Sequence, residues 1–267
     1  EPGAEGTVLY PSGTSALAQA LLTVLRPGDS VLVADNVYEP TRHIASGLLK
    51  TFGIAARFFN PFDHDAYTAA FDDTTKAVML ESPGSLTMEV CDVPALAAIA
   101  RNRGAVSLLD NTWATSLGYP ALQHGCDIAI TALTKHHGGH SDVMMGAASA
   151  ARPLYARLRQ SARQFGIVVS PDDAALVSRG MRTMAVRLGQ ESKTALTLAR
   201  WLADRAEVAA VFCPMLDGAP GNDLWKRDFA GGCGLFSFAL TTEHSPADRD
   251  ALIDALELFG IGYSWGG

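Results

Sequence analysis

The alternation of short apolar runs with amphipathic stretches constrains the fold of this 267-residue chain more than any other feature. Apolar residues recur at helical spacing around residues 17–25 and 96–100. Between and after these stretches lie runs with the length and composition of buried strands, at residues 30–35, 76–82, 105–111, 127–131 and 146–150. Strands that alternate with helices form right-handed crossovers, so we expect an α/β fold with a mainly parallel sheet flanked by helices.

The pattern changes after about residue 185. A helical stretch there has Leu198, Trp201 and Leu202 on one face. Residues 234–241 have the composition of a half-buried strand, and we expect a last helix to carry Leu252, Leu256 and Phe259. We therefore expect a large domain over residues 1–185 and the start of a smaller α+β domain, incomplete here, over residues 186–267.

Composition limits the partners and the compartment. The formal net charge is −7 and no basic run occurs, so we expect no nucleic-acid partner, because binding to phosphates needs clustered Lys and Arg. Charged residues, Gly or Pro break every apolar stretch before the ~20 residues of a membrane span, so we expect no membrane insertion. The four cysteines lack a C-x-x-C pair, which is typical of reduced thiols in a cytoplasmic protein.

Three short stretches place reactive groups where an α/β sheet binds ligands. Asp110 closes an apolar strand and Lys135 soon follows the next one, so both should reach the same edge of the sheet. Gly13 and the amides of Thr14 and Ser15 begin a helix, where free N–H groups favour a phosphate. Each feature alone is more often a surface lysine or a helix cap. Together they supply the amine, the acid and the phosphate anchor that pyridoxal phosphate requires.

The stretch TKHHGGHSD, residues 134–142, allows a second interpretation as a metal site on His136, His137 and His140. Two imidazoles at i and i+4 share a helical face. However, two successive glycines each cost a helix about 1 kcal/mol relative to Ala, and the motif contains no Glu that could act as a base. We therefore expect no metal, and we expect His140 to shape the loop after Lys135 through hydrogen bonds.

Motifs spread through the chain carry a family resemblance. They include SGTSA (12–16), ESPGSLTMEVCDVPA (81–95), LDNTWAT (109–115), TKHHGGHSD (134–142) and YSWGG (263–267). With these motifs in this order, the sequence resembles the Cys/Met-metabolism family of fold type I pyridoxal-phosphate enzymes, and within it the bacterial cystathionine β-lyases. The resemblance implies that Lys135 is the catalytic lysine that forms the Schiff base, that Asp110 pairs with the pyridinium nitrogen, and that Tyr38 stacks on the ring and takes part in catalysis.

The resemblance also implies the remaining contacts of the site. Gly13, Thr14 and Thr134 would hold the cofactor phosphate. The substrate, a small amino acid, would be bound through the YSWGG turn by Tyr263, Ser264 and Trp265. Many relatives have Ser where this chain has Ala132 and Tyr where it has His136, so we expect one phosphate hydrogen bond of the family to be absent here.

The function implied by the resemblance is α,β-elimination of L-cystathionine to homocysteine, pyruvate and ammonia in methionine biosynthesis, by a homotetramer built as a dimer of dimers. A γ-acting relative, cystathionine γ-synthase or γ-lyase, would share the cofactor residues and is the alternative. The N-terminal Tyr-x-Arg and the C-terminal Arg of the family are absent from residues 1–267. We therefore expect this chain to be part of a longer enzyme, or a non-catalytic homologue if those segments are truly missing.

Overall fold

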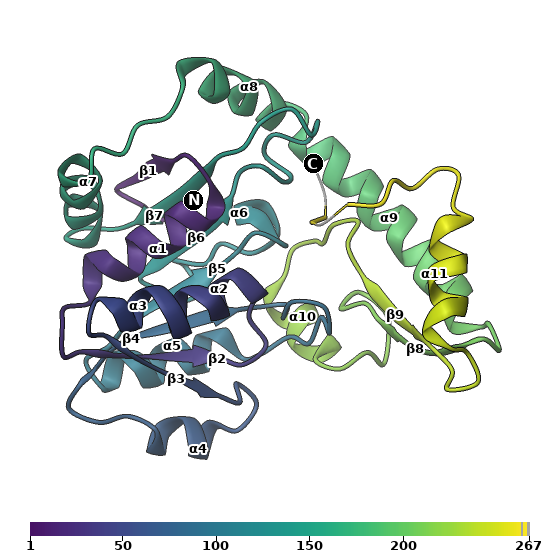
Figure 1. Ribbon diagram of the computed structural model, residues 1–267, viewed down its shortest axis with the longest axis horizontal. Coiled ribbons are helices and arrows are strands. Elements are labelled where there is room, and N and C mark those ends of the chain that lie inside the picture. Colours follow the sequence, from purple (N-terminus) through teal and green to yellow (C-terminus); the bar gives the residue numbers. More distant parts are fainter. Residues whose placement is uncertain (263, 266–267) are drawn as a thin grey trace.

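A seven-stranded sheet forms the centre of the computed structural model, which describes residues 1–262 and 264–265 (Figure 1). The strands lie in the order β1-β7-β6-β5-β4-β2-β3. Their bounds are β1 Gly6–Tyr10, β2 Ser30–Ala34, β3 Ala55–Phe59, β4 Thr75–Glu81, β5 Val106–Asp110, β6 Ile128–Ala132 and β7 Gly146–Ala150. The pairs from β3 through β2, β4 and β5 to β6 are parallel, so the predicted mainly parallel sheet is confirmed.

Strand β7 runs opposite to the rest, because it pairs antiparallel with both β6 and β1. An irregular segment, and no crossover helix, joins β6 to β7, which is compatible with antiparallel pairing. Every strand predicted in the first 150 residues is present, but β1 and β3 were not anticipated. Both are edge strands with mixed exposure, so they lack the continuous apolar run that reveals a buried strand.

Helices cover the sheet. They are α1 Gly13–Val24, α2 Glu39–His43, the π-helix η1 Ile44–Leu48, α3 Leu49–Thr51, α4 His64–Ala69, α5 Val93–Asn102, α6 Thr115–Gly118, α7 Leu154–Gln164 and α8 Pro171–Met181. The Ser12 hydroxyl caps α1 and the Asp92 carboxylate caps α5. Helices α1 and α7 pack together against β1 and β7, while α5 packs against β4 and β5.

A long helix, α9 (Met184–Ala203), leads from this body to a two-stranded antiparallel sheet of β8 (Val208–Phe212) and β9 (Ser237–Leu240) (Figure 1). Helices α10 (Asn222–Asp228) and α11 (Pro246–Asp254) complete this part. The domain boundary expected at residue 185 falls in the first turn of α9. The strand predicted at 234–241 is confirmed as the shorter β9.

One detail of this C-terminal part was predicted wrongly. Helix α11 ends at Asp254, so Leu256 and Phe259 lie beyond it, and both are exposed. Leu198, Trp201 and Leu202 lie in α9 as predicted, but Leu198 and Trp201 are 36% and 56% exposed. The small side chains of Ala195 and Ala199 are buried instead, since they allow the helix backbone to approach β8 closely.

Two observations bear on the environment of the chain. All four cysteines, Cys91, Cys126, Cys213 and Cys233, are unpaired and buried, as predicted for reduced thiols. Within residues 1–262 and 264–265, no helix is both long and apolar enough to cross a membrane.

Candidate active site

The carboxyl ends of β6, β5, β4 and β2 are neighbours along one edge of the sheet, and each leads into a residue with a reactive or polar group. In that order the residues are Lys135, Asp110, Glu81 and Tyr38. Strands β5 and β4 end together, because Asp110 and Glu81 are partners in the register. The structure therefore brings Lys135, Asp110 and Tyr38, which the sequence singled out, to the edge where parallel sheets bind ligands.

One oxygen of the Asp110 carboxylate is held by hydrogen bonds within the protein. Its Oδ1 accepts hydrogen bonds from the backbone N–H of Thr112 at 3.0 Å and from the Thr112 hydroxyl at 2.6 Å. That hydroxyl in turn accepts the backbone N–H of Ala132 at 2.9 Å, which ties the carboxylate to the end of β6. Burial raises the pKa of Asp110, and the two bonds from Thr112 oppose that rise. Within the described part of the chain Oδ2 accepts no hydrogen bond, so this oxygen is available to a ligand.

Lys135 lies in a series of turns that follows β6. Its Nζ donates to the Ser264 hydroxyl at 2.7 Å and to the backbone carbonyl of Trp265, whose ring centroid is 5.1 Å away. Desolvation lowers the pKa of Lys135, which favours the neutral, reactive amine. The predicted substrate residues Ser264 and Trp265 thus lie beside the lysine, while Tyr263 falls outside the described residues.

The loop after Lys135 depends on its two glycines. The amide of Gly138 donates to the Leu133 carbonyl and that of Gly139 to the Lys135 carbonyl, both at 2.8 Å. Gly139 has a φ of +69°, and a Cβ there would overlap the guanidinium of Arg187. A residue with a side chain would therefore be strained at this position and would displace Arg187.

The beginning of α1 forms a cradle with free donors. Ser12 satisfies the amides of Ser15 and Ala16, each at 3.0 Å. In the described structure the amides of Gly13 and Thr14 have no acceptor, and they lie at the positive end of a 12-residue helix. A Cβ on Gly13 would lie 2.7 Å from the Cβ of Ala132, so glycine is what lets α1 approach β6. This cradle fits a phosphate group.

The Thr134 hydroxyl is already engaged in hydrogen bonds within the protein. Its hydroxyl donates to the Met145 carbonyl at 3.2 Å and accepts the Met145 N–H at 3.0 Å. In this arrangement the hydroxyl proton is used in joining the lysine loop to the start of β7. The structure therefore places Thr134 beside Lys135 without directing a free hydroxyl donor toward the cradle.

The three histidines of the loop do not converge. Residues 133–138 form turns rather than a helix, as the paired glycines predicted. Burial lowers the pKa of His136 and His137 to about 4, so the 3.6 Å approach of His136 Nδ1 to Glu191 Oε2 is not an ion pair at neutral pH. His140 donates from Nδ1 to the Gly138 carbonyl at 2.8 Å, which confirms its loop-shaping role. Across the described chain, no three metal-ligating side chains gather.

Two contributors to the site, Glu81 and Thr112, were missed by sequence reasoning. The Glu81 carboxylate accepts the backbone N–H of Tyr38 at 2.7 Å. Burial and the neighbouring Asp110 raise the pKa of Glu81 well above its ordinary value. Glu81 closes a predicted strand in the same way as Asp110, so the strand-end rule that selected Asp110 could have selected it too.

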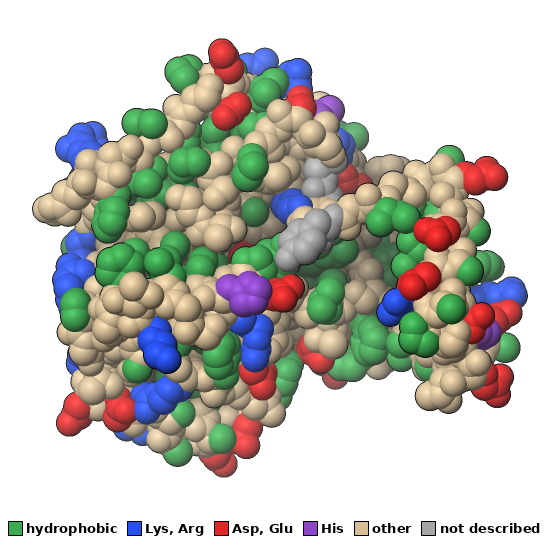
Figure 2. Space-filling model, in the orientation of Figure 1, with side chains coloured by type: hydrophobic (Ala, Val, Ile, Leu, Met, Phe, Trp, Pro, Cys, Tyr) green, Lys and Arg blue, Asp and Glu red, His purple; other side chains and the backbone are tan. Residues whose placement is uncertain are grey.

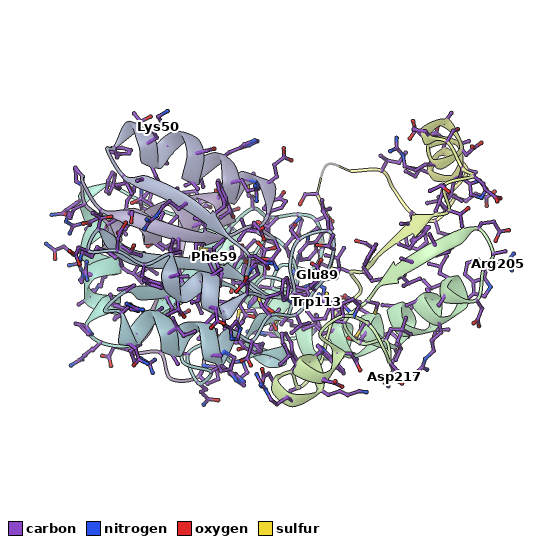
Figure 3. All side chains as sticks on the ribbon, turned by 90° about the horizontal axis from the view of Figure 1, so that it is seen from below. Lys50, Phe59, Glu89, Trp113, Arg205 and Asp217 are labelled. Atoms are coloured by element: carbon purple, nitrogen blue, oxygen red, sulfur yellow. The ribbon has the colours of Figure 1, made fainter. Side chains whose placement is uncertain are left out.

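The lysine loop also borders the C-terminal part of the molecule. A cleft of about 240 Å³ is lined by Lys135, His136, Gly139, Arg187, Glu191, Gly234, Leu235 and Trp265, and Figure 2 shows the surface notched between the two parts. Trp113 links them, because its indole N–H donates to the Leu235 carbonyl at 3.1 Å and its ring meets Phe229 edge-on. Figure 3 shows Trp113 and Glu89 where the two parts meet.

Comparisons with known proteins identify the family of the chain. Residues 2–267 match the family model for Cys/Met metabolism PLP-dependent enzymes. The cystathionine β-lyase of Escherichia coli is 41% identical over 267 residues, which are 99% of this chain and 68% of that protein. An L-alanine/L-glutamate racemase of Wolbachia pipientis is 36% identical over 265 residues, which are 99% of this chain and 65% of that protein.

A solved structure extends the likeness to three dimensions. The cystathionine γ-synthase of Xanthomonas oryzae pv. oryzae, determined in complex with aminoacrylate and cysteine, superposes with a TM-score of 0.95 at 30% sequence identity. The match covers 99% of this chain and 68% of that one. The predicted fold type I is thereby confirmed, and the chain belongs to the Cys/Met-metabolism family of pyridoxal-phosphate-dependent enzymes.

Proposed function

We propose that this protein is a cystathionine β-lyase, which cleaves the Cβ–S bond of L-cystathionine and yields homocysteine, pyruvate and ammonia. The observation that carries the proposal is the 41% identity to the Escherichia coli enzyme along 99% of the chain. The arrangement of Lys135, Asp110 and Tyr38 at one sheet edge supports it, because an elimination next to an amino group needs a base and an acid partner for the cofactor.

The residues present fit pyridoxal phosphate. The free amides of Gly13 and Thr14 would hold its phosphate, Asp110 would face the ring nitrogen through Oδ2, and Tyr38 would cover the ring. When bound, the cofactor supplies a sink for the electron pair left on the substrate α-carbon. Thr134, whose hydroxyl proton is engaged by Met145, would contribute to the phosphate site only after its side chain turned.

Lys135 is the proposed base. Its partly buried amine has a lowered pKa, which favours the neutral Nζ that can remove the α-proton. Asp110 would carry the negative charge opposite the ring nitrogen and would favour the protonated form of that nitrogen. As the α-proton moves to Lys135, the Cβ–S bond breaks and the sulfur leaves with its electron pair as a thiolate. We propose that Ser264, Trp265 and Tyr263 bind the substrate, which is supported for the first two by their contacts with Lys135.

Two other reactions begin with the same α-proton. A γ-acting enzyme removes a second proton, from Cβ, whereas a racemase returns the proton to the opposite face of the α-carbon. The second possibility has a specific basis in the 36% identity to the Wolbachia racemase. The products separate all three, because only β-elimination from cystathionine gives pyruvate.

The test is product analysis on the purified holoenzyme. With L-cystathionine, we expect pyruvate and homocysteine in equal amounts. With L-alanine or L-glutamate, we expect no D-enantiomer at a comparable rate. Release of 2-oxobutyrate with cysteine would indicate a γ-lyase, and formation of D-amino acid without a keto acid would indicate a racemase. A protein that binds cofactor and releases no product from any of these would be a non-catalytic homologue.

We further propose a cytoplasmic homotetramer, built as a dimer of dimers and active in methionine biosynthesis, with domains at residues 1–185 and 186–267. The unpaired, buried cysteines support a reducing compartment. The separate two-stranded sheet beyond α9 supports the domain division. Light scattering coupled to size-exclusion chromatography measures the oligomeric mass, and a dimeric or monomeric mass would contradict the tetramer.

A further inference from the structure

Two carboxyl groups stand side by side at the base of the proposed cofactor site. Glu81 ends β4 and Asp110 ends β5, and the two residues are partners in a parallel register. Adjacent carboxyl groups that are removed from water cannot both carry a negative charge at low cost. Such a pair favours a single negative charge, and the surrounding hydrogen bonds determine which carboxyl group carries it.

The hydrogen bonds favour ionisation of Asp110. Its Oδ1 receives two donors, the N–H and the hydroxyl of Thr112. Among the described residues Glu81 receives one donor, the N–H of Tyr38. Each donor stabilises a carboxylate relative to the protonated acid. The Cys91 thiol also lies near Glu81, and it donates to the Glu81 backbone carbonyl at 3.6 Å. The pKa of Glu81 is accordingly raised well above normal, by burial and then by Asp110.

The bond from Tyr38 connects Glu81 to the stacking ring. Tyr38 is the N-cap of α2, and no side chain within that turn caps the helix. Its N–H donates instead to Glu81 Oε2 at 2.7 Å, across 43 residues of sequence. Glu81 therefore fixes the backbone of Tyr38, from which the ring projects, relative to β4, the strand that lies next to the strand of Asp110.

We propose that Glu81 is a positioning residue of the cofactor site, a neutral carboxylic acid that tethers Tyr38 to the sheet and leaves the negative charge of this edge on Asp110. The role rests on the proposed functions of Tyr38 and Asp110 toward pyridoxal phosphate. It does not depend on the substrate or on the type of elimination.

The first test compares two substitutions by cofactor affinity. Glu81→Gln keeps the shape, the neutral state and an acceptor for the Tyr38 N–H, so the Kd for pyridoxal phosphate should stay within about threefold of the wild-type value. Glu81→Leu leaves that N–H without its acceptor, and the Kd should rise roughly tenfold. The visible circular dichroism of the bound cofactor should weaken in Glu81→Leu and be retained in Glu81→Gln, because it reports the asymmetric packing around the ring.

A matched control removes a different carboxylate near Tyr38. Glu39 follows Tyr38 directly and its side chain is 65% exposed, so Glu39→Gln should change neither the Kd nor the dichroism. Far-ultraviolet circular dichroism verifies the fold of each variant. If Glu81→Gln loses as much affinity as Glu81→Leu, Glu81 acts as an anion and the proposal is wrong.

A second test measures the proton itself and requires no catalysis. In the infrared difference spectrum between wild-type and Glu81→Gln holoenzymes at neutral pH, the carbonyl band of a protonated carboxylic acid should be present only in the wild type. A difference that contains only carboxylate bands would overturn the proposal, even if the protein proved to be a cystathionine β-lyase. Conversely, a failure of the product assay would leave this result unaffected.

Discussion

Substitution of Gly13 by alanine tests the proposed phosphate cradle. The added Cβ would lie 2.7 Å from the Cβ and 3.1 Å from the Cα of Ala132, whereas unstrained carbon contacts lie at about 3.5–4.0 Å. Helix α1 must therefore withdraw from β6 by several tenths of an ångström, and overpacking of this kind costs about 1–3 kcal/mol.

This withdrawal of α1 should weaken cofactor binding. The displaced amides of Gly13 and Thr14 would each lose part of a charged hydrogen bond worth about 1.5–3 kcal/mol. A combined loss of ~1.4–2.8 kcal/mol corresponds to a 10- to 100-fold higher Kd for pyridoxal phosphate. The assay is titration of the apoprotein with cofactor, followed by the quenching of tryptophan fluorescence.

Two matched variants isolate the cause. Adding Ala132→Gly to Gly13→Ala removes the opposing Cβ and should recover most of the affinity. Gly189→Ala, in α9, places a Cβ in open space and should leave the Kd unchanged while stabilising the helix by about 0.5–1 kcal/mol. An unchanged Kd in Gly13→Ala, or no recovery in the double variant, would refute the steric argument and the location of the cradle.

Two further predictions concern charge. Replacing Asp110 with Asn keeps the shape of the side chain but removes the anion opposite the ring nitrogen. Turnover of cystathionine should therefore fall at least 100-fold, a loss of about 3 kcal/mol of transition-state stabilisation, while the cofactor still binds. Near-normal turnover would contradict that role of Asp110. Because burial lowers the pKa of His136 and His137 to about 4, the unfolded chain gains protons below about pH 6.5 that the native protein does not. Stability should thus be full above that pH and should fall toward pH 4 by up to about 3 kcal/mol per histidine. Urea unfolding of the double variant His136→Phe, His137→Leu should show a shallower acid loss, and parallel curves for variant and wild type would exclude these histidines as the cause.

Much of the fold could be predicted because buried parallel strands carry a recognisable pattern. Strands β2, β4, β5 and β6 each contain consecutive buried apolar residues, and their ends locate Asp110 and Lys135 without knowledge of tertiary contacts. The edge strands β1 and β3 are only five residues long and mix exposed, intermediate and buried positions, so they lack the continuous apolar run that marks the central strands. The extent of α11 was overestimated because Leu256 and Phe259 continue the helical spacing of apolar residues. Both side chains are exposed and do not pack in the core.

The parts of the site that escaped prediction depend on contacts between distant segments. The Thr134 hydroxyl is engaged by Met145, 11 residues later, and the pairing depends on where the lysine loop meets β7. The tether between Glu81 and Tyr38 depends on β4 lying next to β2. The sequence shows which groups could form such hydrogen bonds. Which partner each group meets depends on the order of the strands in the sheet.

The measurement that tests the central claim most directly is the location of the covalently held cofactor. Borohydride reduction of the holoenzyme followed by proteolysis and mass spectrometry of the peptides fixes the pyridoxyl group to the amine that carried it. We expect a single modified residue, Lys135, in the peptide that follows β6, and no stable label in Lys135→Ala. Modification of another lysine, such as the exposed Lys50 or Lys193, with Lys135 unmodified would contradict the account of this active site.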